Sequence, residues 1–146
     1  KSTLTSVLSC GPKEYDDGRG AMRAKVFNFS HEAENGRTSS IGHEIVGFDS
    51  TGKQVVVHST KGKKKQVWPE IMNQSSKVIQ MVDLCGHEKY LKTTMYGLTG
   101  LYPHYAMVVI GANMGIQRMT KEHIGISMAL KIPFFIVVTK IDLAPQ

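Results

Sequence analysis

Apolar residues fall into short runs along the chain, and polar or glycine-containing segments separate these runs. Near the start, residues 2–9 place Leu4, Val7 and Leu8 at helical spacing, which predicts a short helix. The next segment, residues 11–43, is polar and carries turn-forming glycines, so we expect a long loop there. Long loops within compact domains tend to be either functional or mobile, which makes this loop a candidate part of a site.

The middle of the chain predicts a hairpin, a short helix and a strand. Residues 45–49 lead through a polar turn into residues 54–57, a pattern typical of a β-hairpin. Residues 68–74 fit a short helix, and residues 77–83 form an apolar run that ends on an aspartate. We expect this last run to be a strand.

The final third alternates apolar runs with one amphipathic stretch. Residues 105–110 and 134–138 have the length and composition of parallel strands that are buried on both faces. Between them we predict a helix with Thr120 as its N-cap, and Pro133 separates it from the last strand. Strand–helix–strand alternation of this kind predicts an α/β domain with a mostly parallel sheet.

Composition narrows the class of protein. The 146 residues are 41% hydrophobic and 21% charged, which excludes wholesale disorder and fits one domain. No apolar run approaches the ~18 residues of a membrane helix, so no membrane partner is expected. The two cysteines, Cys10 and Cys85, are too few for a disulfide framework or a four-cysteine zinc site. A reducing, cytoplasmic location is therefore expected.

The positive charge is modest and uneven. Lys and Arg number 18 against 12 Asp and Glu, a net charge of +6 with histidine neutral, and four of these lysines lie in a lysine-rich loop at residues 59–67. This loop is either a solvated surface segment or a contact to RNA phosphates. No aromatic residues alternate with the lysines, so a base-stacking platform is not indicated, and DNA is not an expected partner.

Two stretches before the first predicted strand could bind phosphate and metal. Lys1-Ser2-Thr3, directly before a helix, matches the end of the G-x-x-x-x-G-K-[ST] loop, in which the lysine contacts phosphates and the hydroxyl holds magnesium. Thr38 lies in the long loop, where a threonine can give magnesium a second hydroxyl. Taken alone, these are also an ordinary helix start and an ordinary turn.

A second pair of stretches follows predicted strands. In Asp83-Leu84-Cys85-Gly86-His87, a carboxylate at a strand end could hold magnesium through water, and the glycine amide could approach a γ-phosphate. In Thr139-Lys140-Ile141-Asp142, the carboxylate could accept two hydrogen bonds from guanine, which adenine cannot donate in the same pattern. Each motif also has a purely structural interpretation: a strand that ends in an ordinary aspartate and a turn glycine, or a surface lysine followed by an N-cap aspartate. Cys85 is either a small buried side chain or a redox-sensitive thiol.

The order of these motifs is more specific than any one of them. A chain with Lys-Ser before a helix, a loop threonine, Asp-x-x-Gly after one strand and Thr-Lys-x-Asp after another resembles the GTP-binding domain of the elongation factor Tu-like translational GTPases. Within that group it is most similar to the GTP-binding protein 1 and 2 subfamily. The block from Asp83 to Thr94 carries most of this resemblance, which extends over nearly the whole chain. It implies a P-loop NTPase fold, a three-layer α/β sandwich.

The resemblance implies a role for each matching residue. It identifies residues 11–43 as a switch I-like loop region, makes His87 the residue that orients the attacking water, and names GTP or GDP and Mg²⁺ as cofactors. Ser2, Thr38 and Asp83 would hold the magnesium. The residues implied to bind the nucleotide are Lys1, Ser2, Thr3, Thr38, Asp83, Gly86, Thr139, Lys140 and Asp142.

Departures from the family pattern limit these expectations. The first strand and the glycine-rich half of the phosphate loop are not in this sequence, so we expect residues 1–146 to be a partial GTP-binding domain that binds GTP poorly by itself. Thr139 stands where many GTPases have Asn, and Arg37 precedes Thr38 where elongation factor Tu has an apolar residue. A surface role is expected for Arg37.

Several functions remain open from the sequence. The resemblance implies GTP hydrolysis by a switch that acts with the ribosome or in RNA quality control, with tRNA or RNA-decay machinery as further partners. The alternative is a nucleotide-dependent binding module of RNA surveillance with little turnover. A third possibility is an adenine-specific ATPase, against which Thr139-Lys140-Ile141-Asp142 argues.

Overall fold

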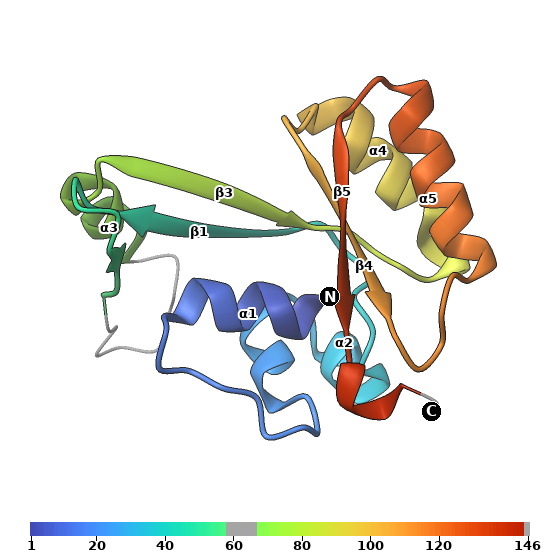
Figure 1. Ribbon diagram of the computed structural model, residues 1–146, viewed down its shortest axis with the longest axis horizontal. Helices are drawn as coiled ribbons and strands as arrows, with labels where there is room; N and C mark the ends of the chain where they lie inside the picture. Colours follow the sequence, from blue (N-terminus) through green and yellow to red (C-terminus); the bar gives the residue numbers. More distant parts are fainter. Residues whose placement is uncertain (58–66, 145–146) are drawn as a thin grey trace. The chain divides into compact units, whose positions relative to one another are not determined.

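The computed structural model describes residues 1–57 and 67–144 and divides into two compact units, Lys1–Asp83 and Leu84–Gln146. The lysine-rich loop predicted at residues 59–67 lies outside the described residues, apart from its last residue. Within the described ranges, no helix combines the length and the apolar character that crossing a bilayer requires. Both units mix helices with strands, which confirms the α/β class (Figure 1).

The first unit is built on an antiparallel sheet in the order β2-β1-β3. Strand β1, Gly42–Phe48, pairs with β3, Lys77–Asp83, along its whole length, and Gly42 lies opposite Asp83. Strand β2, Gln54–Val55, completes the predicted hairpin. The register brings the carboxyl end of β3 to the start of β1, where the long loop ends.

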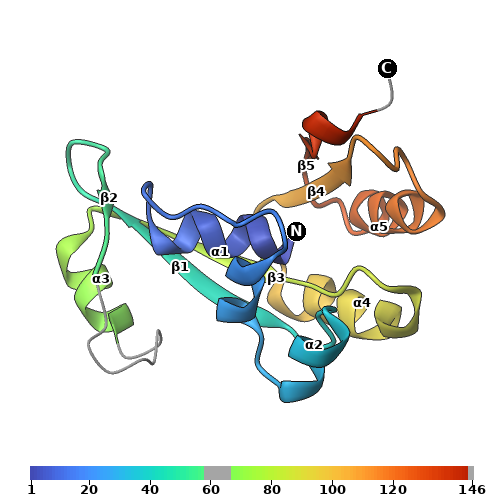
Figure 2. The same ribbon diagram turned by 90° about the horizontal axis from the view of Figure 1, so that it is seen from below.

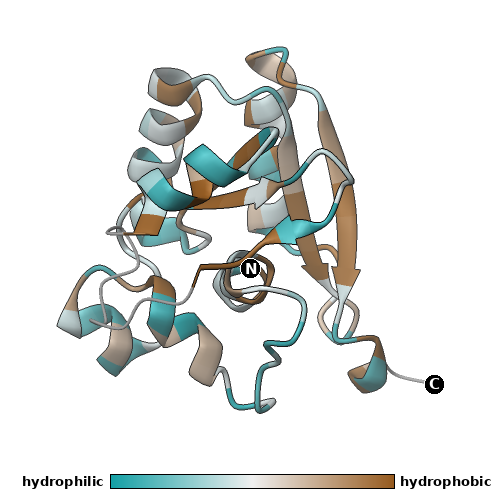
Figure 3. Cartoon of the chain, turned by 90° about the vertical axis from the view of Figure 1, so that its left-hand side faces the viewer, coloured by the Kyte–Doolittle hydropathy of each residue, from teal (hydrophilic) through white to brown (hydrophobic). Residues whose placement is uncertain are grey.

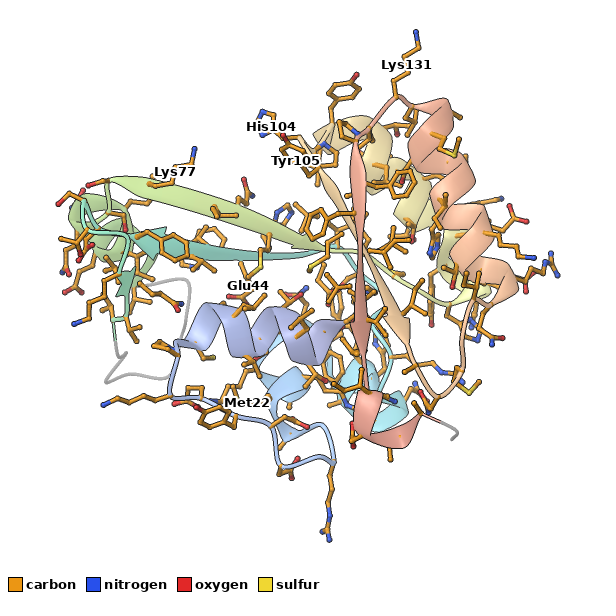
Figure 4. The ribbon with its side chains drawn as sticks, in the orientation of Figure 1. Met22, Glu44, Lys77, His104, Tyr105 and Lys131 are labelled. Atoms are coloured by element: carbon orange, nitrogen blue, oxygen red, sulfur yellow. The ribbon has the colours of Figure 1, made fainter. Side chains whose placement is uncertain are left out.

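Two helices cover this sheet. Helix α1, Ser2–Cys10, packs against β1 and β3, and Figures 1 and 2 show it running alongside β1. Helix α3, Trp68–Gln74, packs against β1, with Ile71 Cγ2 only 2.7 Å from the point where a side chain on Gly47 would begin. The core of this unit consists of apolar side chains from the loop, β1 and α3: Met22, Val26, Ile45, Val46 and Ile71 (Met22 is labelled in Figure 4).

The segment predicted as a long loop contains two short helices. They are the 3₁₀ helix η1, Ala21–Val26, and α2, Ser30–Asn35. The Asp16 carboxylate accepts three backbone N–H bonds just before and within η1, and such local bonds wind the chain into turns. Hydrophobic periodicity misses these helices because each is too short to show a full pattern.

The second unit contains a parallel pair of strands, β4, Ala106–Gly111, and β5, Phe134–Thr139. Helix α4, Leu91–Leu101, precedes β4, and α5, Arg118–Ala129, connects the two strands and packs against β4. The parallel pair therefore matches the predicted strand–helix–strand unit. The three-stranded sheet differs from the expected mostly parallel arrangement, because β1 and β3 are antiparallel neighbours.

Two local expectations for this unit are wrong. Helix α5 begins before Thr120, since the carbonyl of Gln117 accepts the Thr120 N–H at 3.0 Å and Gln117 is the N-cap. Strand β5 is also not buried on both faces: Phe135 is 50% and Ile136 49% exposed. Among the described residues β5 pairs only with β4, and Figure 3 shows these strands as strongly hydrophobic.

Candidate nucleotide site

The first cluster of candidate residues lies where the two ends of the first unit meet. Lys1 precedes α1 and Asp83 ends β3, yet the Lys1 Nζ lies 2.8 Å from the Asp83 Oδ1. The Asp83 side chain is 2% exposed and the Lys1 side chain 34% exposed. A buried carboxylate requires a cation or several hydrogen-bond donors, and the lysine supplies this charge.

Two hydroxyl groups meet at the same end of α1. The Oγ of Ser2, in the first turn of the helix, lies 2.7 Å from the Oγ1 of Thr38 in the long loop. Both side chains are partly buried, and Thr3, the next residue in the helix, is also half-buried. Adjacent hydroxyl oxygens are ligands of the hard type that Mg²⁺ prefers.

The donor set of this cluster fits magnesium better than a transition metal. No group of three or more His, Cys, Asp or Glu suited to a metal ion occurs in the described part of the chain. A metal at Ser2, Thr38 and Asp83 would therefore be bound directly by two hydroxyls and by oxygens of water or phosphate, with the carboxylate holding one of those waters. Mg²⁺ is commonly held in this way, with few protein ligands.

Glu32 holds the loop that contains Thr38 in place. The sequence analysis did not select this residue. Its side chain is fully buried in α2. One carboxylate oxygen accepts the backbone N–H groups of Asn28 and Phe29, and the other accepts the N–H and hydroxyl groups of Ser39 and Ser40. These bonds favour the charged form and outweigh the opposing effect of burial, so the pKa of Glu32 falls from 4.5 to about 2.

This lowered pKa predicts a stability change in acid. The pKa of Glu32 is lower in the folded than in the unfolded state, so the ionised group stabilises the fold above about pH 4.5, and this contribution is lost as the pH falls towards about 2. At neutral pH the contribution is about 3 kcal/mol. Denaturant unfolding of the full-length protein should show the gap between wild type and Glu32→Gln shrinking between pH 6 and pH 3.

The matched control is Glu34→Gln, on the exposed side of the same helix. Its unfolding free energy should follow that of the wild type at each pH. A gap between wild type and Glu32→Gln that stays constant down to pH 3 would contradict the assignment of this pH dependence to Glu32.

The turn that holds His87 opens the second unit. The Thr94 hydroxyl donates to the Cys85 carbonyl at 2.7 Å, and the Cys85 side chain is 1% exposed, which fits the small buried role. Gly86 and His87 are exposed. His87 Nδ1 accepts the Lys89 backbone N–H at 3.2 Å, so a neutral His87 ring carries its proton on Nε2.

The Thr139-Lys140-Ile141-Asp142 stretch begins at the end of β5, beside the end of β4. Thr139 is opposite Gly111, and its carbonyl accepts the Ala112 N–H at 2.8 Å. Lys140 has a φ of 57°, a left-handed conformation, and its Cδ lies 3.7 Å from the point where a Gly111 side chain would begin. The Asn113 Oδ1 lies 2.9 Å from that point. Gly111 thus leaves room for both the lysine stem and an asparagine that the sequence analysis missed.

The predicted site residues therefore form separate groups. Lys1, Ser2, Thr38 and Asp83 come together within the first unit. In the second unit, Thr139 and Lys140 lie beside Gly111 and Asn113, Asp142 is exposed in the short helix Ile141–Leu143, and Gly86 and His87 form the turn before α4. That all of them face one pocket stays a prediction.

Hydroxyls, an ammonium group and a buried carboxylate thus meet at the end of a strand in an α/β domain, the groups expected of a site for phosphate and magnesium. The comparison with known families makes this specific: the elongation factor Tu GTP binding domain matches residues 1–146, and the chain belongs to that family. The resemblance to translational GTPases is confirmed at this level.

Two relatives point to the GTP-binding protein 1 and 2 subfamily, and a third is an elongation factor. The chain is 51% identical to GTP-binding protein 1 of Xenopus laevis over 145 residues, which cover 99% of the chain and 22% of that relative. It is 50% identical to human GTP-binding protein 2 over 146 residues, 100% of the chain and 23% of that relative. A selenocysteine-specific elongation factor of Haemophilus influenzae is 40% identical over 68 residues, 46% of the chain and 11% of that protein. The chain thus spans less than a quarter of these relatives.

Proposed function

We propose that this chain is the nucleotide-binding part of a GTP-hydrolysing switch that binds GTP and GDP with Mg²⁺. The observation that carries the proposal is the pairing of Lys1 with Asp83, 82 residues away, beside the contact of Ser2 with Thr38. The match of residues 1–146 to a GTP-binding domain supports it. These residues are where the sequence motifs require phosphate and magnesium contacts.

The first unit would hold the phosphates. Lys1 would contact phosphate oxygens, while Ser2 and Thr38 would hold Mg²⁺ directly and Asp83 would hold it through water. The metal, when bound, neutralises charge on the phosphates. Ser2 and Asp83 lie on α1 and β3, which pack together, and Lys1 directly precedes α1, so the chain contributes positioned groups rather than covalent chemistry.

The water-orienting role belongs to His87 in this proposal. With its Nδ1 engaged by the Lys89 N–H, the neutral ring can only donate from Nε2. It would therefore hold a water molecule through the water oxygen and would not remove its proton. Gly86, next to it, would offer a backbone amide to the γ-phosphate. Turnover would stay slow until a partner brings His87 into place.

Base specificity would come from the second unit. The Asp142 carboxylate would accept hydrogen bonds from the guanine ring, and the Lys140 stem would lie against the base. Thr139 offers fewer hydrogen bonds than Asn, and the nearby Asn113 carboxamide could compensate. Adenine lacks the matching donors, which disfavours the ATPase alternative.

The partners follow from the class of relatives. Proteins similar to this chain are named as an elongation factor and as translation initiation factor IF-2. On this basis we propose a cytoplasmic protein that acts with the ribosome, or in RNA quality control with tRNA or RNA-decay machinery as partners. The alternative of a binding module with little turnover is favoured by one observation, the exposure of His87 and its engagement with its own turn.

Asp83→Asn tests the proposed magnesium site. In the full-length protein this change keeps the size of the side chain but removes its charge, so Mg²⁺-dependent GTP affinity should fall about 10–100-fold. A fluorescent GTP analogue titrated at several Mg²⁺ concentrations measures this effect. The matched control is Glu70→Gln, an exposed carboxylate on α3 of the same unit. Equal affinities for the two variants, or wild-type binding that a chelator leaves unchanged, would contradict the site.

A further inference from the structure

The Glu32 carboxylate links two parts of the long loop that are separated in sequence. Its Oε2 accepts the backbone N–H groups of Asn28, at 2.8 Å, and of Phe29, at 3.2 Å. Its Oε1 accepts four donors: the N–H groups of Ser39 and Ser40 at 2.7 and 3.0 Å, and their hydroxyls at 3.0 and 2.9 Å. The start of α2 and the residues directly after Thr38 are thereby fixed to one buried group.

All six donors are neutral groups. A fully buried carboxylate is costly unless its lone pairs are satisfied, and charge-assisted hydrogen bonds are about twice as strong as neutral ones. The segment 38–40 is therefore held in place by a strong, local set of bonds. The lowered pKa of Glu32 agrees with this, because it keeps the carboxylate charged at any physiological pH.

A second contact supports the same loop on the other side of Thr38. The Arg23 guanidinium donates to the Gly36 carbonyl at 3.4 Å, and Gly36 has a φ of 63° at the C-cap of α2. Gly36 and Ser39 thus both have fixed partners, and Thr38 lies between them with its hydroxyl 2.7 Å from Ser2. The position of the Thr38 hydroxyl is set by its neighbours.

We propose that Glu32 is a positioning residue that presents Thr38 to the γ-phosphate-bearing nucleotide, and that it discriminates GTP from GDP without touching either. This inference rests on the proposed function. A loop threonine gains its magnesium contact only when a γ-phosphate is present, so ordering the loop in advance favours GTP over GDP. Glu32 acts through Ser39 and Thr38 and is not a catalytic residue.

Glu32→Gln is the most specific test of this inference, because it preserves the shape of the side chain and changes only its charge and hydrogen-bonding groups. A carboxamide replaces one acceptor oxygen by an NH₂ donor, which must then face either two or four donors of the loop. Such mismatched buried groups weaken the bonds to Ser39 and Ser40. Glu34→Gln, on the same helix but exposed, removes the same charge without touching the loop.

The experiment measures nucleotide affinity and loop order in the full-length protein. Equilibrium binding of a non-hydrolysable GTP analogue and of GDP, both with Mg²⁺, should show an affinity for the analogue about tenfold lower in Glu32→Gln, with the affinity for GDP unchanged. Hydrogen exchange of the backbone amides of residues 38–40 should accelerate in Glu32→Gln. Glu34→Gln should match the wild type in both measurements.

Each other outcome is informative. Equal losses for the analogue and GDP would overturn the inference and leave Glu32 a residue of the fold alone, and an unaffected Glu32→Gln would also overturn it. If Glu32→Gln unfolds, the double variant Ser39→Ala with Ser40→Ala removes only the hydroxyl donors and should show a smaller analogue-specific loss. A wild-type protein that binds neither nucleotide would overturn the proposed function as well, which distinguishes the two failures.

Discussion

Replacing Asp142 by Asn in the full-length protein should change the preferred nucleotide from GTP to xanthosine triphosphate. Guanine presents an N1–H and an amino group, both donors, which the Asp142 carboxylate would accept in the proposed site. Xanthine carries a carbonyl in place of the amino group, and the carboxamide of the variant can donate to that carbonyl while accepting the N1–H. In the variant the guanine amino group would face a donor in place of its acceptor, which is expected to weaken GTP binding by an amount on the order of 10⁴-fold.

Competition binding with GTP, XTP and ATP measures this change of specificity. The control is Glu122→Gln, which removes an exposed carboxylate on α5 of the same unit and should leave the preference for GTP unchanged. If Asp142→Asn retains wild-type GTP affinity, Asp142 does not contact the base. ATP competing as well as GTP against the wild-type protein would revive the adenine-specific alternative.

His87→Ala should reduce partner-stimulated GTP hydrolysis by about 10²–10⁴-fold while leaving GTP affinity within about twofold of the wild type. In the proposed role the histidine would act on the attacking water, which matters in the transition state and not in the bound ground state. Single-turnover hydrolysis of GTP with ribosomes, together with equilibrium binding, separates these two quantities.

A second histidine provides the control for this experiment. His104, just before β4 and labelled in Figure 4, is exposed like His87 but lies outside the motif, so His104→Ala should hydrolyse GTP at the wild-type rate. If His87→Ala keeps its cellular function without measurable hydrolysis, the protein works as a nucleotide-dependent binding module. If His87→Ala hydrolyses GTP at the wild-type rate, His87 does not orient the attacking water.

The elements that the sequence predicts best are those with a full apolar pattern between clear breaks. The helix at residues 68–74 and the strand at 77–83 match α3 and β3 residue for residue. The meeting of Lys1 with Asp83 and of Ser2 with Thr38 follows from the order of the motifs, since phosphate-binding loops and strand ends converge in folds of this family. The order of the motifs is sufficient there, because Ser2 and Asp83 stand at the ends of the helix and the strand that bring them together.

Glu32 could not be found in this way. An acidic residue in a polar segment has no apolar periodicity, and such residues are almost always exposed. Its burial depends on six donors that surround it only after α2 has formed and residues 39 and 40 have folded back. The one sequence signal is weak: Glu32 lies at the N3 position of α2, where a side chain can reach back to the first turn.

The paired strands β1 and β3 also define where a reporter group can be attached. Their register runs from Gly42 opposite Asp83 at one end to Phe48 opposite Lys77 at the other, a span of about 20 Å at ~3.4 Å per residue. The turn after Phe48 is held by its own bonds to Asp49, and Gly52 at its tip has open space around it. A dye or a short epitope inserted beside Gly52 should therefore leave the contacts among Lys1, Ser2, Thr38 and Asp83 undisturbed and allow the first unit to be followed in solution.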